Sequence, residues 1–393
     1  MKKTKIICTL GPSTDNAELI GKMITAGMDL ARFNFSHGKK DEHAARMEMV
    51  RKASLLAQKP VALIADTKGP EMRLGVFEED EVELFPQDSF CLTTEEVRGT
   101  RHLATVNYPG LPAEVRPGDD ILLADGLLSL RVESIEGKKI HTRVTHGGKL
   151  SSRKRVAVPG ALLNLPFLSA DDEKDIAFAI QQEMDYIAAS FVQKAEDVLA
   201  IRRLTEELNS EIGIIAKIEN EEGVRNIEEI INVADGIMVA RGDLGVEIPS
   251  EIVPLVQKDI IKRCNKAGKP VITATQMLES MIASYRATRA EASDVANSIF
   301  DGTDAIMLSG ETASGRYPLE AVMTMAKIAQ RTEEALDYVA IFRQKGIGKS
   351  TNTTDAISHA TVQIAQELDA NAIITVTESG YTARMTAKYR PQA

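Results

Sequence analysis

Short apolar runs alternate with amphipathic segments along most of this 393-residue chain. A short apolar run bounded by turn residues predicts a buried strand, and apolar positions three and four apart predict a helix. Before residue 70 the pattern predicts three strands and two helices, the first helix with Thr14 or Asp15 as its N-cap. The strands are Thr4–Leu10, Met28–Asn34 and Val61–Ala65, and the helices are 14–26 and 40–57.

The alternation stops at Pro70 and returns only after Pro159. Between them, strand-like runs are separated by turn pairs such as Pro109-Gly110 and Asp125-Gly126. This spacing is typical of small all-β domains. We therefore expect a small β-barrel or sandwich inserted into a loop over residues 70–158.

Beyond residue 159 the alternation predicts five more strands, which makes eight of this kind. The strands are Tyr186–Phe191, Ile212–Ile218, Gly236–Ala240, Pro270–Ala274 and Ala305–Leu308; the helices are 170–182, 195–209, 223–233, 251–267, 277–300 in two parts, and 318–338. Eight parallel strands, each followed by a helix, indicate a (β/α)8 TIM barrel with its active site at the carboxyl ends of the strands. A doubly wound open sheet is the rival, because the pattern does not give the strand order.

Composition narrows the range of partners. The formal net charge of −10 argues against binding a nucleic-acid backbone, and 4% aromatic residues without tryptophan argue against base stacking. Cys8, Cys91 and Cys264 are too far apart for a metal or redox motif, which suits a reducing cytoplasm. We see no signal peptide and no apolar stretch long enough for a bilayer, and so expect no membrane partner.

Charged residues stand where the apolar strands end. Lys217 and Glu219 are two apart, so the period of a strand places both on one face. A core ion pair is one explanation, but the next strand also runs into charge, at Asp243. Buried charges are costly unless they meet a metal, a phosphate or each other, so two such strand ends favour a functional site.

The other strand ends complete a ring of polar residues. Glu219 and Asp243, on neighbouring strands, are the carboxylates that could hold Mg²⁺. The ring contains Arg32, Asn34, Ser36, Asp66, Thr67, Lys217, Glu219, Gly242, Asp243, Thr275, Ser309 and Glu311.

Two further chemistries are open to this ring. Asn34, Ser36 and Asp66 offer only oxygen ligands, which suit a hard cation, although Asn-x-Ser is also a common capping pair. Arg32 and Lys217 could bind a phosphoryl group. The sequence contains no Walker A motif, no G-x-G-x-x-G and no H-E-x-x-H, so it does not support the common nucleotide and zinc sites.

At these residues the chain resembles the pyruvate kinase family. The resemblance covers residues 1 to about 338 in the family's order. The matching runs are Thr4–Pro12 (TKIICTLGP), Ala31–Gly38 (ARFNFSHG), Asp66–Glu71 (DTKGPE), Ala216–Asn220 (AKIEN), Met238–Glu247 (MVARGDLGVE), Thr273–Leu278 (TATQML) and Met307–Thr312 (MLSGET).

The resemblance implies transfer of a phosphoryl group from phosphoenolpyruvate to ADP, giving pyruvate and ATP. Glu219 and Asp243 would bind Mg²⁺ or Mn²⁺, and Lys217 and Arg32 would act on the phosphoryl group. Gly242, Asp243 and Thr275 would hold the substrate carboxylate, with Thr275 also among the catalytic residues.

The resemblance also implies a potassium site and a nucleotide site. Potassium would be held by Asn34, Ser36, Asp66 and Thr67. The nucleotide would be held by Asn34, His37, Arg73 and Lys154. A glutamate at position 71 goes with potassium dependence in the family, and the negative charge of Asp66 and Glu71 beside an anionic substrate calls for a compensating cation.

Four segments are expected from this comparison: barrel 1–69, inserted lid domain 70–158, barrel 159–340 and a partial α/β domain 341–393. The lid would close on the barrel mouth and exclude water. The last segment is expected to hold a helix (354–368), a strand (372–377) and part of another helix, and thus to be a fragment of the family's third domain. The family forms homotetramers, so we expect a homo-oligomer.

Two departures from the family accompany these matches. The run Ser284–Glu291 lacks both prolines that the family has there. In the family the loop at Thr377–Thr382 forms one wall of a sugar-phosphate effector pocket, but Glu378 puts a negative charge there, and an ordinary strand-to-helix turn is the alternative.

Two other functions remain open at the level of sequence. A metal-dependent lyase that handles phosphoenolpyruvate or oxaloacetate would share Glu219 and Asp243 but would need no lid. A catalytically impaired barrel that only binds substrate is the other.

Overall fold

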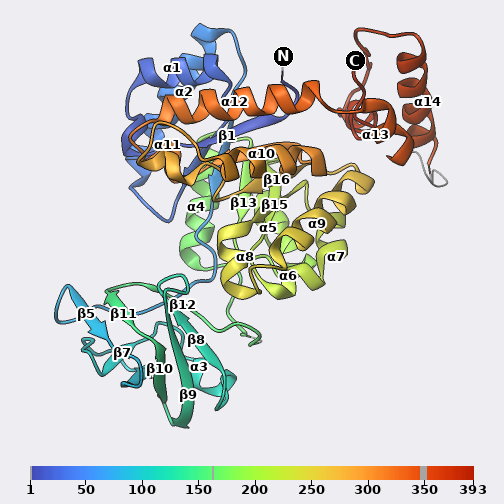
Figure 1. Ribbon diagram of the computed structural model, residues 1–393. Helices are drawn as coiled ribbons and strands as arrows, with labels where there is room; N and C mark the ends of the chain where they lie inside the picture. Colours follow the sequence, from blue (N-terminus) through green and yellow to red (C-terminus); the bar gives the residue numbers. More distant parts are fainter. Residues whose placement is uncertain (1, 162, 346–351) are drawn as a thin grey trace.

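The computed structural model describes residues 2–161, 163–345 and 352–393. Three parts are visible in Figure 1: a central barrel, a β-rich domain below it, and a small group of helices beside the opposite end. Among the described residues, no helix is both long enough and apolar enough to cross a membrane.

Eight parallel strands form a closed barrel. β1 pairs with β17 in parallel, Lys5 opposite Ala305, so the sheet has no free edge and the open-sheet alternative is wrong. The strands are β1 (Lys5–Thr9), β2 (Leu30–Asn34), β3 (Ala62–Asp66), β13 (Tyr186–Ala189), β14 (Gly213–Ile218), β15 (Gly236–Ala240), β16 (Val271–Ala274) and β17 (Ala305–Leu308).

Helices cover the outside of the barrel, as the apolar pattern predicts. They are η1 (Pro12–Thr14), α1 (Ala17–Ala26), α2 (Lys40–Ala57), α4 (Ala170–Gln181), α5 (Ala195–Glu207), α6 (Glu221–Arg225), α7 (Ile227–Val233), α8 (Arg241–Glu247), α9 (Val253–Ala267), η2 (Glu279–Ile282), α10 (Arg289–Asp301), α11 (Gly310–Ala313) and α12 (Pro318–Glu334). The N-cap prediction for α1 is wrong: Asn16 caps it, accepting a bond from the Leu19 amide, because a 3₁₀ turn takes up Thr14.

Successive side chains of a strand point to opposite faces of the sheet, so the strand residues of the barrel belong to two separate cores. Ile214 and Ala216 on β14 pack outward against the helices, whereas Ile215 joins a cluster inside the barrel with Ile7 and Ile64. On β1, β3, β13 and β14, continuing the inner row by two residues leads to a polar residue at the carboxyl end of the strand. The barrel interior thus fixes which side chains reach the mouth.

The inserted domain is built from a seven-stranded sheet and a two-stranded one, with a short helix α3 (Leu111–Glu114). Its edge strands approach each other through the Leu74–Val106 bridge and the bond from the Gly75 amide to Thr105 O (2.8 Å), which curls the sheet toward a barrel. The strands are β4 (Met72–Arg73), β5 (Glu81–Leu84), β6 (Ser89–Thr93), β7 (Leu103–Thr105), β8 (Asp120–Leu123), β9 (Leu128–Glu136), β10 (Lys139–His146), β11 (Gly148–Ser151) and β12 (Arg155–Ala157).

The C-terminal part consists of α13 (Tyr338–Lys345), α14 (Thr353–Glu367) and α15 (Tyr381–Ala387). The strand predicted at 372–377 is wrong: the structure has no strand there, and Ile374 and Val376 are 90% and 96% exposed. A strand needs a neighbour for its backbone bonds, and none of the described residues supplies one to this segment. The helix predicted at 354–368 is confirmed.

Candidate active site

The polar residues at the mouth continue the inner rows of the barrel. Thr9 follows Ile7, Asp66 follows Ile64, and Lys217 follows Ile215, each two residues further along its strand. The strands are in register, with Arg32 opposite Thr9 and Asn34 opposite Asp66. The prediction that the ring residues of these strands share one face and one end of the barrel is therefore confirmed for this group.

Lys217 lies at the centre of the mouth. Its Nζ is 3.0 Å from Asp66 Oδ1 and 3.0 Å from Glu219 Oε1, and it donates a 2.6 Å bond to Ser190 Oγ. Lys217, Asp66 and Glu219 are all buried. A buried ammonium therefore holds two buried carboxylates, one from the end of its own strand β14 and one from the end of β3.

The electrostatics of this cluster keep the lysine charged. Burial alone would lower the pKa of Lys217, but Asp66 and Glu219 raise it above its ordinary value. Burial would likewise raise the pKa of Asp66, but Arg32 and Lys217 lower it. Glu219 differs: burial raises its pKa, and Lys217 only partly offsets this while the charge of Asp243 adds to it.

Arg32 supplies a second cation on the same carboxylate. Its Nε donates to Asp66 Oδ2 (2.7 Å) and its Nη1 to Thr9 Oγ1 (2.9 Å). Both oxygens of Asp66 are therefore paired with cations, so Asp66 orients Arg32 and Lys217 side by side.

Glu219 and Asp243 are each held by a neighbour. Glu219 Oε2 accepts a 2.7 Å bond from the backbone amide of Phe191, a residue with a φ of 57°. Asp243 pairs with the guanidinium of Arg155, which comes from the inserted domain.

Thr275 sits in a strained turn against α8. Its φ is 66°, a left-handed conformation that costs a β-branched residue about 1–3 kcal/mol. Its Oγ1 accepts a 2.6 Å bond from the Gly242 amide, and Arg241 Nη2 donates to its carbonyl oxygen at 2.8 Å. A Cβ at residue 242 would lie 3.3 Å from Thr275 Oγ1, so glycine permits this close approach.

The oxygen ligands suggested for potassium lie at the ends of β2 and β3. Asn34 Oδ1 accepts a bond from the Ser36 amide (3.1 Å), and the Ser190 amide donates to Thr67 Oγ1 (3.3 Å). The carboxylate of Asp66 is already balanced by two cations. An unbalanced negative charge, on which the sequence argument for a potassium ion depended, is thus not present at Asp66.

The residues suggested for the nucleotide are more scattered. Arg73, on β4, pairs with Glu71 (Nε to Oε2, 2.9 Å), so Glu71 too has its own cation. Lys154, which directly precedes the neighbouring strand β12, is exposed, and so is His37 in the turn after β2.

Sequence reasoning missed two residues of this site. Ser190 follows the inner residue Ala188 by two positions, so the same period could have found it. Arg155 carries no such signal, because it belongs to the inserted domain. Glu311, included in the ring, accepts bonds from the backbone amides of Leu278 (3.0 Å) and Ser309 (2.7 Å) and thus supports loops.

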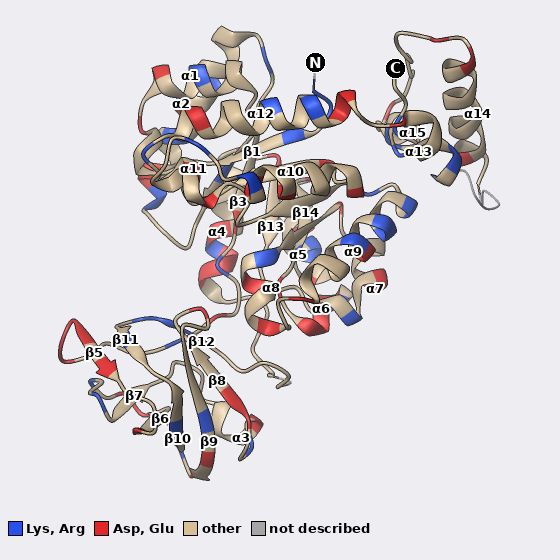
Figure 2. Cartoon of the chain, viewed as in Figure 1, with Lys and Arg blue, Asp and Glu red and all other residues tan. Residues whose placement is uncertain are grey.

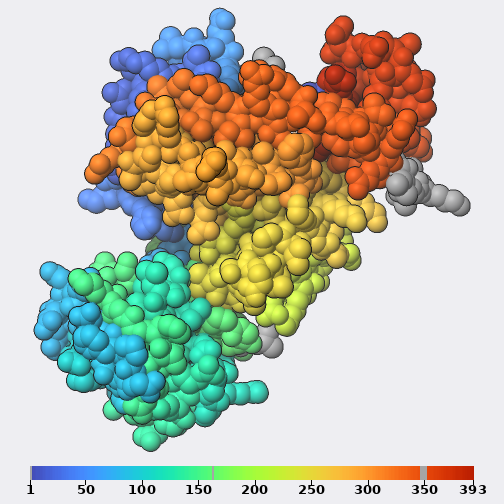
Figure 3. Space-filling model, in the orientation of Figure 1, coloured from blue at the N-terminus to red at the C-terminus, as the bar shows by residue number. Residues whose placement is uncertain are grey.

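A hollow lies between the inserted domain and the barrel. Its volume is 540 Å³, and its lining includes Glu71, Arg155, Phe191, Asn220 and Glu247. Figure 3 shows the inserted domain standing off from the barrel beside this region, and Figure 2 shows acidic residues on α6 and α8 facing it. In the described part of the chain no three His, Cys, Asp or Glu side chains could together hold a metal, so a metal here would have fewer such ligands.

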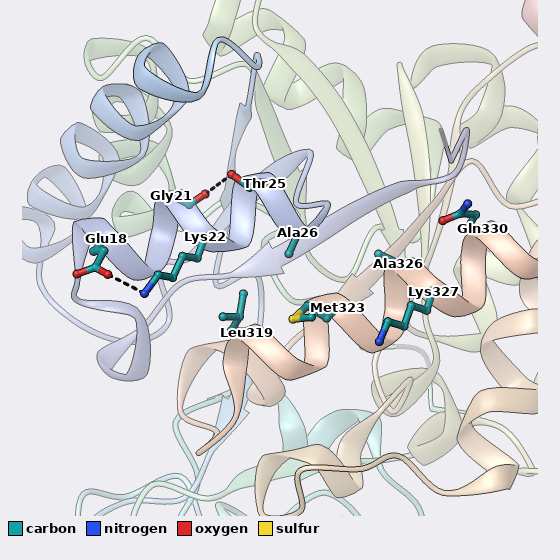
Figure 4. Close-up of a pocket in the computed structure, with 10 residues that line it drawn as sticks. All are labelled: Glu18, Gly21, Lys22, Thr25, Ala26, Leu319, Met323, Ala326, Lys327 and Gln330. Carbon is teal, nitrogen blue, oxygen red and sulfur yellow. Dashed lines mark hydrogen bonds and ion pairs between the residues drawn. The ribbon is translucent and has the colours of Figure 1, made fainter.

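A second hollow, of 590 Å³, lies on the outer surface between α1 and α12 (Figure 4). Leu319, Met323 and Ala326 line one side, and Glu18 and Lys22 on the other side pair with each other at 2.6 Å. None of the ring residues lines either hollow. We assign the active site to the barrel mouth because the buried charges of the ring meet there.

Comparison with known proteins agrees with this geometry. A family model described as the barrel domain of pyruvate kinase matches residues 1–322, and one described as its alpha/beta domain matches residues 355–393. The chain is 53% identical to the pyruvate kinase of Bacillus licheniformis over 396 residues, covering all of this chain and 68% of that protein.

Other relatives give the same result. The pyruvate kinase of Geobacillus stearothermophilus is 52% identical over 395 residues, which cover all of this chain and 67% of that protein. Among solved structures, a pyruvate kinase from Cryptosporidium parvum superimposes with a TM-score of 0.95 at 42% identity, covering 99% of this chain and 81% of that one.

Proposed function

Because this chain belongs to the pyruvate kinase family, we propose that it is a phosphotransferase that moves the phosphoryl group of phosphoenolpyruvate to ADP, giving pyruvate and ATP. The observation that carries this proposal is the buried, charged Lys217 held beside Arg32 at the barrel mouth. Phosphoryl transfer depends mainly on positioning and on neutralising charge, and two oriented cations supply both.

Glu219 and Asp243 fit a divalent cation such as Mg²⁺ or Mn²⁺. Both are oxygen donors, and burial disfavours the charge of Glu219 until a cation compensates it. We propose that these two carboxylates hold the ion, which supplies charge neutralisation at the phosphoryl oxygens when bound. The chain's own side chains bind and orient the substrate at the barrel mouth.

We assign the phosphoryl group to Lys217 and Arg32 and the substrate carboxylate to the region of Gly242, Asp243 and Thr275. Lys217 stays protonated, so it can neutralise charge throughout the transfer. The Gly242 amide now donates to Thr275 Oγ1, and it would exchange that bond for one to the substrate.

The nucleotide and potassium assignments rest on the family resemblance. We propose that Asn34, His37, Arg73 and Lys154 contact the nucleotide, with Arg73 leaving Glu71 for a phosphate. We propose potassium at Asn34, Ser36, Asp66 and Thr67, all oxygen donors at adjacent strand ends. A cytoplasmic location, homo-oligomeric assembly, and domain boundaries at 69/70, 158/159 and 340/341 are proposals of the same standing.

The experiment is an assay of pyruvate formation from phosphoenolpyruvate with and without ADP, coupled to lactate dehydrogenase. The proposal expects pyruvate only when ADP is present. Pyruvate at equal rates without ADP would indicate a lyase or phosphatase, and binding of phosphoenolpyruvate without any pyruvate would indicate a non-catalytic barrel.

A further inference from the structure

Arg155 lies where the inserted domain joins the barrel. It is the first residue of β12, which pairs with β4, so these two strands carry the chain out of and into that domain. The side chain is only 7% exposed although it leaves its own domain. An arginine this buried needs partners for its charge.

The partners of Arg155 are groups of the barrel mouth. Its guanidinium pairs with Asp243 and lies 3.6 Å from Glu247 Oε1. It also stacks over the ring of Phe191, 4.6 Å from the centroid, and the amide of that same residue binds Glu219. One cation of the inserted domain therefore meets both carboxylates that we assign to the metal, Asp243 directly and Glu219 through Phe191.

The charge balance supports a competition at Asp243. The guanidinium of Arg155 stays charged in proteins and lies against Asp243 and Glu247. A divalent cation on Asp243 would repel a guanidinium that contacts the same carboxylate. Both cannot use this oxygen at once.

Glu247 provides a second carboxylate with which the guanidinium of Arg155 can pair. Asp243 and Glu247 are four residues apart on α8, so they lie on one face of the helix, about one turn apart. Arg155 already lies near both. A shift from the first carboxylate to the second would carry β12, and with it the inserted domain, along α8.

We propose that Arg155 is a positioning residue that couples the inserted domain to the metal site: it holds Asp243 before the metal arrives and pairs with Glu247 afterwards. This inference rests on the proposed function, because it takes Glu219 and Asp243 as the metal ligands. It goes further by assigning a metal-responsive movement of the inserted domain to one ion pair.

The first test measures binding of Mn²⁺ alone, by the electron paramagnetic resonance of free Mn²⁺, to the full chain without substrates. We expect Arg155→Met to tighten binding several-fold, because it removes the competitor, and Glu247→Gln to weaken it several-fold, because it removes the second acceptor. Arg131→Met is the matched control, since Arg131 pairs with Asp120 inside the inserted domain, and its affinity should equal that of the wild type.

Opposite effects of the two variants support the coupling. If both weaken binding, or neither changes it, Arg155 only braces the structure and the proposal is wrong. Glu219→Gln separates this failure from that of the proposed function. If Glu219→Gln leaves Mn²⁺ affinity unchanged, the metal assignment itself is wrong.

The second test measures the movement of the inserted domain directly. Spin labels at Ser134→Cys on β9 and Glu206→Cys on α5, with Cys91→Ser to remove the part-exposed native thiol, report the position of the inserted domain. Adding Mg²⁺ alone should change the distance between the labels. An unchanged distance would overturn the proposal, and a changed distance that persists after adding Arg155→Met would do so as well.

Discussion

Lys217 carries the most specific claim at the scale of single residues. Its ammonium contacts Asp66, Glu219 and Ser190 in a buried site. During the reaction it would contact the phosphoryl group. An interaction of this kind acts mainly in the transition state, in which the negative charge of the phosphoryl group is being transferred.

We expect Lys217→Ala to lower kcat by about 10²–10³ while KM for phosphoenolpyruvate stays within a few-fold of wild type. Steady-state kinetics with both substrates measure this. Lys174→Ala, which removes an exposed ion pair with Asp171, is the control and should leave both constants unchanged. A rise in KM alone would make Lys217 a binding residue and contradict its assigned role.

Potassium dependence is the second prediction at this scale. Arg73 balances Glu71, and Arg32 and Lys217 balance Asp66, so the prediction now depends on the family and on the oxygen ligands of Asn34, Ser36 and Thr67. We expect at least about tenfold less activity in sodium or tetramethylammonium than in potassium, since a cation there would add positive charge beside the phosphoryl site. Equal rates in the three salts would refute it.

The position of a residue in its strand decided whether the sequence could identify it as part of the site. Lys217 and Asp66 were predicted because each is a charged residue where an apolar strand ends. Ser190 was missed because the predicted strand ran on to Phe191 and enclosed it, whereas β13 ends at Ala189. Arg155 could not be found, because its contact with Asp243 depends on how two domains are placed and not on any local pattern.

At the scale of elements, the three C-terminal helices α13, α14 and α15 share only a small hydrophobic core. Phe342, Val362 and Tyr389 form a small cluster there. The helix over 354–368 and part of a further helix were predicted, since local periodicity suffices for a helix, whereas α13 was not predicted. The prediction of a strand at 372–377 was wrong because a strand also needs a neighbouring strand for its backbone hydrogen bonds, which the local pattern does not show.

Lys345, at the end of α13, makes this part sensitive to pH. Its Nζ donates to Lys388 O (3.0 Å). Burial, together with the charges of Arg390 and Lys388 and against that of Asp304, lowers its pKa to about 7. An unfolded lysine titrates near 10.4. Between about pH 7 and pH 10 the folded chain therefore binds fewer protons than the unfolded one, so stability should rise with pH.

We expect Lys345→Met to remove this rise and to stabilise the chain at pH 7, because no charge is then buried. The gain from Lys345 in the wild type is bounded by about 1.4 kcal/mol per pH unit. Urea unfolding at pH 7 and pH 9 measures the difference, with the exposed Lys262→Met as control. A wild type and a Lys345→Met variant with the same pH dependence would contradict this account.

The loop before α15 allows a second prediction for an element. Gly380 has a φ of 74° at the helix start, and Glu378 is exposed in the loop. A phosphate held by one loop that carries a carboxylate should bind too weakly to shift a conformational equilibrium. We expect millimolar fructose 1,6-bisphosphate to leave the phosphoenolpyruvate saturation curve of this 393-residue chain unchanged; a clear leftward shift would contradict that.

At the scale of the whole molecule, the barrel brings side chains from strands far apart in sequence to one mouth, and the inserted domain faces that mouth (Figure 1). The eight strands and the insertion were predictable, because each is a local pattern of apolar residues and turns. The count of eight strands favoured a closed barrel over an open sheet, and the pairing of Lys5 with Ala305, residues 300 positions apart, confirms the closure. The fold is confirmed, and the chemistry at its mouth is the central claim.

The most direct test of that claim is the ratio of ATP to pyruvate formed from phosphoenolpyruvate and ADP with Mg²⁺ and potassium. ATP can be read by luciferase and pyruvate by lactate dehydrogenase, on samples from one reaction. Transfer of the phosphoryl group predicts one ATP for each pyruvate, with both products lost together in Lys217→Ala. Pyruvate without a matching amount of ATP would mean that the phosphoryl group goes to water and would contradict the account.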